Sequence, residues 1–210
     1  MSRLKFEYLP FEERPDLTPY LIHLTKRTKD QDGCYSAFDN LVHILRTRKI
    51  WGSPPGSGFI RGTNPATCFM DVPFSALKYV LNKKNANPQN PRYEPFGIVV
   101  EKKHAYGKGC RPVLYLSDDE FNLIKLPKDE LWRVVKLDVN DDGWISWLHE
   151  REWRCKGNYL LPGKLLAVLV KTPNDASRLQ TMLAEEHDDF KSIPKSIIPL
   201  TVICQGLPYL

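Results

Sequence analysis

Two short stretches of the sequence carry side chains that could take part in chemistry. The stretch "EREW" places Glu150 and Glu152 two residues apart, and the stretch "HLT" places His23 and Thr25 two residues apart. Side chains two apart on an extended strand project from the same face of that strand. Each stretch, if extended, therefore presents two polar groups to one ligand. A carboxylate fixed in such a place can stabilise positive charge that develops during a reaction.

The same carboxylates also have a purely structural interpretation. The charges of "EREWR" could form an ion-pair network on a helix or on a strand, and Glu150 and Arg154 are four residues apart, the spacing of an ion pair on a helix. The two hypotheses predict different placements. A catalytic Glu152 must share one cleft with His23, within about 15 Å, because both groups have to reach the same ligand. A surface ion-pair network carries no such requirement.

Asp71 provides a third, weaker hypothesis. It ends a predicted strand just before a helix that we expect to begin at Pro73, where backbone N–H groups can hold an anion. Asp71 could also join Glu150 and Glu152 in binding Mg²⁺ for nuclease chemistry. That hypothesis requires the three carboxylates to converge within a few ångströms.

Familiar catalytic and metal-binding signatures are absent from the sequence. It contains no G-x-x-x-x-G-K-[ST], G-x-G-x-x-G, G-x-S-x-G or H-E-x-x-H motif. The five cysteines are scattered without a C-x-x-C pair, which argues against a disulfide framework. The spacing H-x5-C occurs twice, at His104/Cys110 and His149/Cys155, but zinc ligands usually lie closer together. We therefore predict no metal site and expect these thiols in or near the core.

Composition and charge indicate an ordinary globular protein. The chain has 210 residues, of which 42% are hydrophobic and 26% charged, and a formal net charge of +5. No apolar run approaches the roughly 20 residues of a membrane span, and the first 17 residues have no continuous apolar region typical of a secretory signal. We therefore expect a cytoplasmic protein with no membrane partner. Its basic residues form short clusters, which suit a nucleic acid or a phosphate-bearing cofactor.

The apolar pattern predicts one α+β domain, with a core over about 19–204 and an N-terminal extension over 1–18. Period-2 and β-branched stretches predict strands, and period-3.6 stretches predict helices. The expected strands cover residues 19–25, 66–72, 96–101, 111–117, 164–171 and 196–204. The expected helices cover residues 36–49, 73–84, 117–126 with a continuation over 129–139, and 173–186. A Gly/Pro/Ser-rich loop over 52–65 is long enough to suggest a functional role.

Several segments, taken in order, resemble a known family. The segments "YLIHLTK", "FDNLVHILRTRKIWGS", "CFMDVPFSALKYV", "FGIVVEKKHAYGKGCRPVLYL" and "EREWR" are similar to the AbiGi-type abortive-infection family of bacteria. The first half is also similar to the DarT-type ADP-ribosyltransferase toxins, through the H-x-T strand, a helix of the "NLxxIL" kind and a "VPF" segment. This resemblance implies an ADP-ribosyltransferase-like fold, a split mixed or antiparallel sheet with flanking helices.

The DarT-type resemblance also implies roles for particular residues. Transfer of ADP-ribose from NAD releases nicotinamide and leaves an oxocarbenium-like ribose, which a late glutamate stabilises. On that pattern Glu152 is the catalytic carboxylate, and Glu150 orients the acceptor. His23 acts beside them and, with Thr25, positions NAD. The further NAD-binding residues implied are Phe74, Tyr79, Lys78 and Arg61. The sequence departs from the pattern after "VPF", where it offers Lys78 in place of an arginine.

Two functions of different classes follow. The first is an ADP-ribosyltransferase-like protein of phage defence or a toxin–antitoxin system, which uses NAD and modifies a nucleic-acid or protein acceptor. The second is a non-enzymatic antitoxin or regulator on the same scaffold, which binds nucleic acid or a cognate toxin through its basic surface. The sequence leaves open whether the protein is an enzyme, and it does not indicate the oligomeric state.

Overall fold

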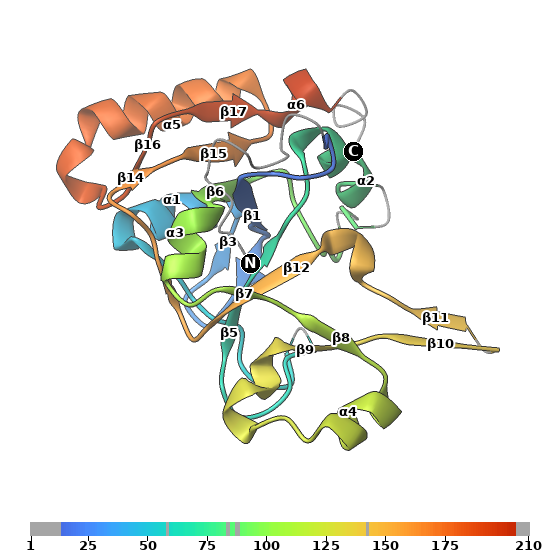
Figure 1. Cartoon of the computed structure of the whole chain (residues 1–210). Helices are drawn as coiled ribbons and strands as arrows, with labels where there is room; N and C mark the ends of the chain where they lie inside the picture. Colours follow the sequence, from blue (N-terminus) through green and yellow to red (C-terminus); the bar gives the residue numbers. More distant parts are fainter. Residues whose placement is uncertain (1–13, 58, 83–84, 87–88, 142, 205–210) are drawn as a thin grey trace, which may run out of the picture.

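The protein is built around one mixed seven-stranded sheet (Figure 1). The computed structural model describes residues 14–57, 59–82, 85–86, 89–141 and 143–204, so most of the expected N-terminal extension lies outside the described residues. The strand order is β17-β15-β6-β1-β5-β12-β7. These strands are β1 (Tyr20–Leu24), β5 (Ala66–Met70), β6 (Gly97–Glu101), β7 (Arg111–Pro112), β12 (Glu152–Lys156), β15 (Ala167–Val170) and β17 (Ile197–Pro199). The α+β class that the sequence predicts, with flanking helices, is confirmed.

The sheet is antiparallel except at one edge, and it is weakly joined near its middle. Among the described strands of this sheet, only the β15–β17 pair is parallel. β1 pairs with β6 over five residues, and β5 pairs with β12 over five residues. Between β1 and β5 the register holds a single pair, Ile22 with Met70. On one side of that pair β1 and β5 therefore diverge, and the sheet is split between them.

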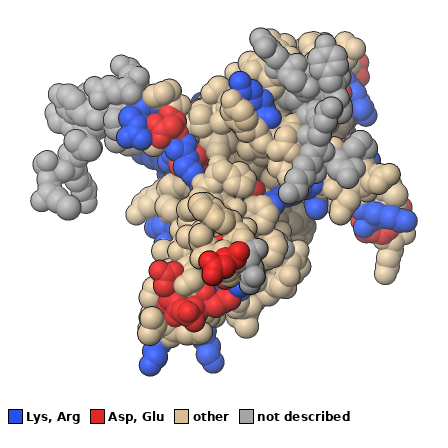
Figure 2. Space-filling model, turned by 90° about the vertical axis from the view of Figure 1, so that its right-hand side faces the viewer, with Lys and Arg blue, Asp and Glu red and all other residues tan. Residues whose placement is uncertain are grey.

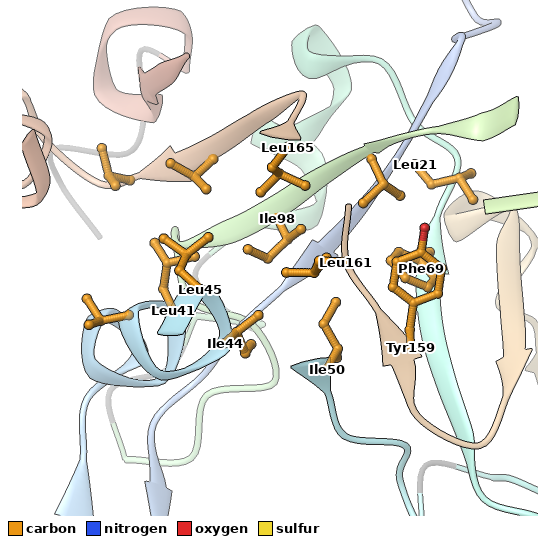
Figure 3. Packing of buried hydrophobic residues seen from close by; sticks show 14 of the residues in the cluster. Leu21, Leu41, Ile44, Leu45, Ile50, Phe69, Ile98, Tyr159, Leu161 and Leu165 are labelled. Carbon is orange, nitrogen blue, oxygen red and sulfur yellow. The ribbon is translucent and has the colours of Figure 1, made fainter. Parts of the chain in front are cut away.

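Helices cover both faces of the sheet (Figure 1). Side chains alternate between the faces along each strand, so each face has its own buried cluster. On one face α1 (Ala37–Thr47), α3 (Lys102–Gly107) and α5 (Pro173–Glu185) pack over the sheet, and α1 contributes Leu41, Ile44 and Leu45, which Figure 3 shows directed toward the strands. On the other face α2 (Leu77–Val80) and α6 (Leu200–Ile203) contribute Leu77 and Leu200.

The longer helices begin at a side chain that caps them. Ser36 caps α1 and Ser117 caps α4 (Asp118–Ile124), each within a capping box. Thr172 caps α5, whose first residue is Pro173. These side chains satisfy backbone N–H groups that have no partner within the helix.

Several expected elements are wrong in type or length. The helix expected over 129–139 is a 3-10 helix (Lys128–Arg133) followed by β9 (Val134–Lys136) and β10 (Asp138–Asn140), because Val134 and Val135 are buried and pair with β8 (Leu114–Leu116). The strand expected over 196–204 ends at Pro199, lies at the edge of the sheet, and is followed by α6. The strand expected over 111–117 divides into β7 and β8, and 102–107, expected as a connection, is α3.

Small elements surround the main sheet. The remaining pairs are β2 (Thr28–Lys29) with β3 (Cys34–Tyr35), β4 (Lys49–Ile50) with β13 (Tyr159–Leu160), β14 (Lys164–Leu165) with β16 (Ile193–Pro194), and β10 with β11 (Gly143–Ile145). The β10–β11 hairpin projects from the body of the protein (Figure 1). The helix expected over 73–84 is, within the described residues, the 3-10 helix Phe74–Ala76 and α2.

No helix in the described part of the chain is long and apolar enough to cross a membrane. On the face that Figure 2 shows, Lys and Arg side chains are dispersed in small groups, and Asp and Glu side chains gather in its lower part. Positive charge therefore does not form one continuous stripe on this face.

Candidate active site

A cavity of about 640 Å³ lies where β1 and β5 part. Its lining includes His23 and Thr25 from the end of β1, and Glu150 and Glu152 from the segment that enters β12. The register explains this convergence, because Ile22, Met70 and Glu152 stand in line across three neighbouring strands. Strands are spaced about 4.8 Å apart, so the backbone of Glu152 lies roughly 10 Å from that of Ile22. The cavity therefore meets the requirement that Glu152 and His23 share one cleft.

His23 occupies the split itself. Its Nδ1 lies 2.8 Å from the carbonyl oxygen of Cys68, which is on β5 beyond the point where β1 and β5 pair. Since a carbonyl only accepts, Nδ1 carries the proton, and a neutral ring then leaves Nε2 as an acceptor. Burial lowers the pKa of His23, while the Cys68 carbonyl acts in the opposite direction. The imidazole is therefore neutral near pH 7.

The Thr25 side chain is already engaged in the fold. Its hydroxyl donates to the carbonyl of Ala37 at 2.9 Å and so ties the end of β1 to the first turn of α1. The side chain is buried, with 5% exposure. Thr25 can offer a ligand only the acceptor capacity of its oxygen.

Glu152 begins β12 and is held by a buried arginine. Its carboxylate accepts from Arg154 Nε at 2.8 Å and from Arg154 Nη2 at 3.3 Å. Arg154 is 1% exposed and also donates to the carbonyl of Trp132 at 2.9 Å. The two side chains are two residues apart on one strand and so share a face. The ion pair is thus Glu152–Arg154 within a strand, which agrees with the strand form of the ion-pair network, and the helical Glu150–Arg154 pair is wrong.

Glu150 is fixed by the loop that precedes β6. Its Oε1 accepts from Arg92 Nη2 at 2.9 Å and from the Tyr93 hydroxyl at 2.8 Å. The Arg92 guanidinium lies 3.7 Å from the ring centre of Trp147, which also lines the cavity. Burial raises the pKa of Glu150, while the charge of Arg92 and the hydrogen bond from Tyr93 lower it. The net direction is upward, so Glu150 takes up a proton more readily than an exposed glutamate.

The two carboxylates reach the cavity through a turn instead of an extended segment. Glu150 ends the 3-10 helix Leu148–Glu150, and Arg151 follows in the left-handed conformation with φ 43°. The Arg151 side chain leaves the cavity and donates to the carbonyl of Asp71 at 2.7 Å. Tyr115 fixes the same segment, because its hydroxyl accepts from the Glu152 backbone N–H at 3.0 Å and donates to the Trp147 carbonyl at 3.2 Å.

The other residues suggested for NAD binding do not line this cavity. Phe74 stacks on Tyr20 with ring centres 4.5 Å apart. Tyr79 is 69% exposed, and the ammonium of Lys78 lies 5.0 Å from its ring centre. Arg61 pairs with Asp118 at 2.6 Å. Of the site residues suggested by the sequence, His23, Thr25, Glu150 and Glu152 therefore line the cavity together.

Asp71 also lies outside the cavity lining. Its carboxylate accepts from Lys102 Nζ at 2.9 and 3.0 Å and from the Thr18 hydroxyl at 2.9 Å. Among the described residues, no group of three or more His, Cys, Asp or Glu side chains is arranged to hold a metal ion. The convergence of carboxylates that the nuclease hypothesis requires is therefore not found in the described part of the chain.

Several cavity residues carried no sequence signal that singled them out. They are Trp51, Arg92 and Tyr93. The loop over 52–65 was expected to be functional, and its Ser53, Ser57 and Phe59 do line the cavity. Arg92 and Tyr93 lie side by side in a proline-rich loop, and their contact with Glu150 depends on tertiary folding alone.

Comparison with known proteins adds one structural likeness. The chain is similar to a solved structure described as Thermus sp. 2.9 DarT in complex with NAD+, with a TM-score of 0.47 and 13% identity, covering 87% of this chain and 96% of that chain. No protein-family model matches the chain, and no curated protein matches it. The AbiGi-type resemblance thus has no support from these comparisons. A likeness at this TM-score and identity carries no conclusion about function.

Proposed function

We propose that the protein is ADP-ribosyltransferase-like, binds NAD in the cavity at the sheet split, and transfers ADP-ribose to a nucleic-acid or protein acceptor. The observation that carries this proposal is that His23 and Glu152, far apart in the sequence, line one cavity of about 640 Å³. Ligand pockets typically measure about 300–1,000 Å³. A neutral hydrogen-bonding ring and a carboxylate on either side of the split suit a ribose placed between them.

Glu152 has the properties that the transfer requires. When the bond between ribose C1′ and the nicotinamide nitrogen breaks, positive charge develops on the ribose, and a fixed carboxylate beside it lowers the barrier. The bidentate contact with Arg154 fixes the orientation of the Glu152 carboxylate. Each carboxylate oxygen retains a further lone pair that can accept from a ribose hydroxyl.

The rest of the cavity supplies groups that suit a dinucleotide. His23 Nε2 can accept from a ribose hydroxyl, because Nδ1 is used on Cys68. Trp51, Phe59 and Trp147 offer flat apolar surfaces for the nicotinamide or adenine ring. Lys26 offers a positive charge for the pyrophosphate. Glu150, held by Arg92 and with its pKa raised, would orient or deprotonate the acceptor.

A second candidate is a non-enzymatic binding module on the same scaffold. It is favoured by the fact that both carboxylates already have cationic partners, Arg154 for Glu152 and Arg92 for Glu150. A cavity stabilised in this way can bind a nucleotide or a partner without transferring anything. The proposed biological setting, phage defence or a toxin–antitoxin system, rests on the order of the sequence segments that resemble AbiGi-type and DarT-type proteins.

The deciding experiment measures NAD turnover and NAD binding together. The purified protein is incubated with labelled NAD and with DNA, RNA and protein acceptors, and NAD affinity is measured by calorimetry. We expect Glu152→Gln to reduce transfer by about 100-fold or more and to retain NAD binding, because glutamine keeps one oxygen acceptor for Arg154. Glu185→Gln, on the exposed face of α5, is the matched control and should leave both quantities unchanged.

Each alternative outcome has a clear meaning. Loss of transfer in Glu152→Gln, with transfer retained in Glu185→Gln, supports the enzyme. Absence of turnover in the wild type, together with salt-sensitive binding to nucleic acid, supports the binding module and overturns the transferase. Cleavage of nucleic acid that requires a metal and no NAD would overturn both.

A further inference from the structure

Two cysteines lie opposite each other on neighbouring strands behind the candidate active site. β7 and β12 pair Pro112 with Trp153 and Arg111 with Arg154. The next position in the same register places Cys110 opposite Cys155. Both thiols belong to the same buried cluster, with 0% and 4% exposure.

The hydrogen-bond pattern makes this a close cross-strand pair. Val113 N–H donates to the Glu152 carbonyl at 3.0 Å, so hydrogen-bonded and non-hydrogen-bonded pairs alternate from there, and Cys110–Cys155 falls on a non-hydrogen-bonded position. The Cys110 N–H accordingly donates to Ala105 in α3. Such pairs have Cα atoms about 4.5 Å apart. A disulfide spans Cα separations of roughly 4.4–6.8 Å, so the backbone already allows the bond.

We propose that Cys110 and Cys155 form a redox-active thiol pair that peroxide converts into a cross-strand disulfide between β7 and β12. Cys155 Sγ lies 3.4 Å from the Lys108 carbonyl, and each of the two thiols shifts the pKa of the other. The remaining cysteines lie elsewhere: Cys34 is exposed, Cys68 is on β5, and Cys204 is buried directly after α6.

The two thiols differ in pKa because their surroundings differ, and they therefore have different roles in the oxidation. The neighbouring Cys110 thiol lowers the pKa of Cys155, and the Cys155 thiol together with burial raises the pKa of Cys110. Cys155 is therefore the better nucleophile. The hydroxyl of Tyr159 is buried and has no hydrogen-bond partner among the described residues, and its pKa is raised by burial and by the proximity of both thiols. It can donate a hydrogen bond to an oxygen that leaves the sulfur.

The oxidation is balanced with hydrogen peroxide as the oxidant. The Cys155 thiolate attacks one peroxide oxygen, the O–O bond breaks, and the hydroxide that leaves takes up a proton to become water. Cys155 is then a sulfenic acid. Cys110 sulfur attacks the Cys155 sulfur, the S–O bond breaks, and the proton of Cys110 leaves with the second hydroxide as water. Two sulfurs have each lost one electron, and one peroxide has become two waters.

Access to the pair follows from its position in the sheet. β7 is the outermost strand and contains only Arg111 and Pro112. Short edge strands open locally without unfolding the domain. Opening of β7 exposes Cys110 and uncovers Cys155 on β12. Cys155 directly follows Arg154, and its side chain lies on the face opposite that of Arg154 and Glu152.

The test is a thiol map of the whole protein before and after peroxide. Protein treated with hydrogen peroxide is unfolded in the presence of an alkylating agent, digested and examined by mass spectrometry. We expect a Cys110–Cys155 cross-linked peptide that disappears on reduction. We also expect the melting temperature to rise by roughly 5–10 °C, because the bond closes a loop of about 45 residues.

Variants separate this pair from the other thiols. Cys155→Ala should lose both the cross-link and the melting shift, and Cys204→Ala, another buried cysteine, should retain both. The proposal is overturned if Cys110 and Cys155 both carry the alkylating group after oxidation, or if either is linked to a different cysteine. The wild-type map decides the question even if Cys155→Ala does not fold, and it does not depend on NAD.

Discussion

At the scale of single residues, the site is a set of buried charges that are all paired. Arg154 is almost fully buried and binds the Glu152 carboxylate with two of its nitrogens. A buried charge that loses its partner is costly, whereas loss of both partners costs less. The pair therefore has two separate effects. It fixes the orientation of the Glu152 carboxylate, and it makes the stability of the protein sensitive to replacement of either residue.

Replacement of Arg154 tests this pairing. We expect Arg154→Met to lower the free energy of unfolding by about 3–5 kcal/mol, because Glu152 is left buried without a cation. The double variant Glu152→Gln/Arg154→Met should be less destabilised than Arg154→Met. Urea unfolding measures all three proteins. Lys156→Met, which removes an exposed pair with Asp129, is the control and should change stability by no more than about 1 kcal/mol. Equal losses for Arg154→Met and the double variant would contradict the pairing.

The raised pKa of Glu150 predicts that the free energy of unfolding depends on pH. Its pKa is raised in the folded protein by burial. In the pH window above the ordinary glutamate pKa, the folded state therefore holds a proton that the unfolded state has lost. The stability that this proton contributes to the folded state is fully present below the ordinary pKa, and it is lost as pH rises through the raised pKa of Glu150. Relative to wild type, Glu150→Gln should become progressively more stable as pH rises through that window.

The measurement for Glu150 is urea unfolding of both proteins over roughly pH 4–8, since glutamate ordinarily titrates near 4.3. Glutamine retains an oxygen that accepts from Arg92 and Tyr93. Glu185→Gln, on exposed α5, reports the effect of removing a carboxylate from the surface. A stability difference between Glu150→Gln and wild type that is constant with pH would show that burial does not raise the Glu150 pKa.

At the scale of elements, the site depends on how closely β1 and β6 approach. Gly97 pairs with Leu24, and a Cβ at Gly97 would lie 2.6 Å from the carbonyl oxygen of His23. That distance is too short for a real contact, so any side chain at this position must displace β1. The absence of a side chain at Gly97 therefore helps to place His23 in the split.

Substitution of Gly97 tests this close approach. We expect Gly97→Ala to lower the free energy of unfolding by about 1–3 kcal/mol through overpacking and to weaken NAD binding by moving His23. Gly107→Ala, at the end of α3, is the matched control, because a Cβ there has no neighbour within 4 Å. Calorimetry with NAD and urea unfolding give the two readouts. Unchanged stability in Gly97→Ala would show that β1 and β6 can separate freely.

At the scale of the whole molecule, the cavity lies between two halves of one sheet. β1 belongs to the half that continues through β6, β15 and β17, and β5 belongs to the half that continues through β12 and β7. The halves share one register pair across the split, Ile22 with Met70. A ligand that contacts His23 on one half and Glu152 on the other would join them.

Hydrogen exchange with and without NAD tests this coupling. At a concentration about 100 times its dissociation constant, NAD should slow exchange by up to about 100-fold for amides that open only when the site is lost. We expect this protection in β1, β5 and β12 and expect α5, which lies away from the cavity, to change little. Protection confined to α5, or none at all, would place NAD elsewhere or exclude its binding.

The sequence by itself determined the local elements and the residues of the two opening stretches. Helices α1, α4 and α5 follow from their caps and from apolar periodicity, which are local signals. Where the local pattern fitted both a helix and a strand, pairing with another strand decided which of the two formed. Val134 and Val135 fit a helical stripe, yet they form β9, because β8 provides a partner strand and burial favours β-branched residues there.

Only the tertiary structure decided which polar groups meet. His23 and Glu152 share a cavity because β5 lies between their strands and pairs with each of them. Phe74 and Tyr79, equally plausible from composition, lie outside the cavity, because Phe74 stacks on Tyr20 and the Tyr79 side chain is 69% exposed. Arg92 and Tyr93 carry no local signal for the site, since their partner Glu150 comes from a distant segment of the chain. Contacts of this kind depend on strand order and register, which no local window of sequence contains.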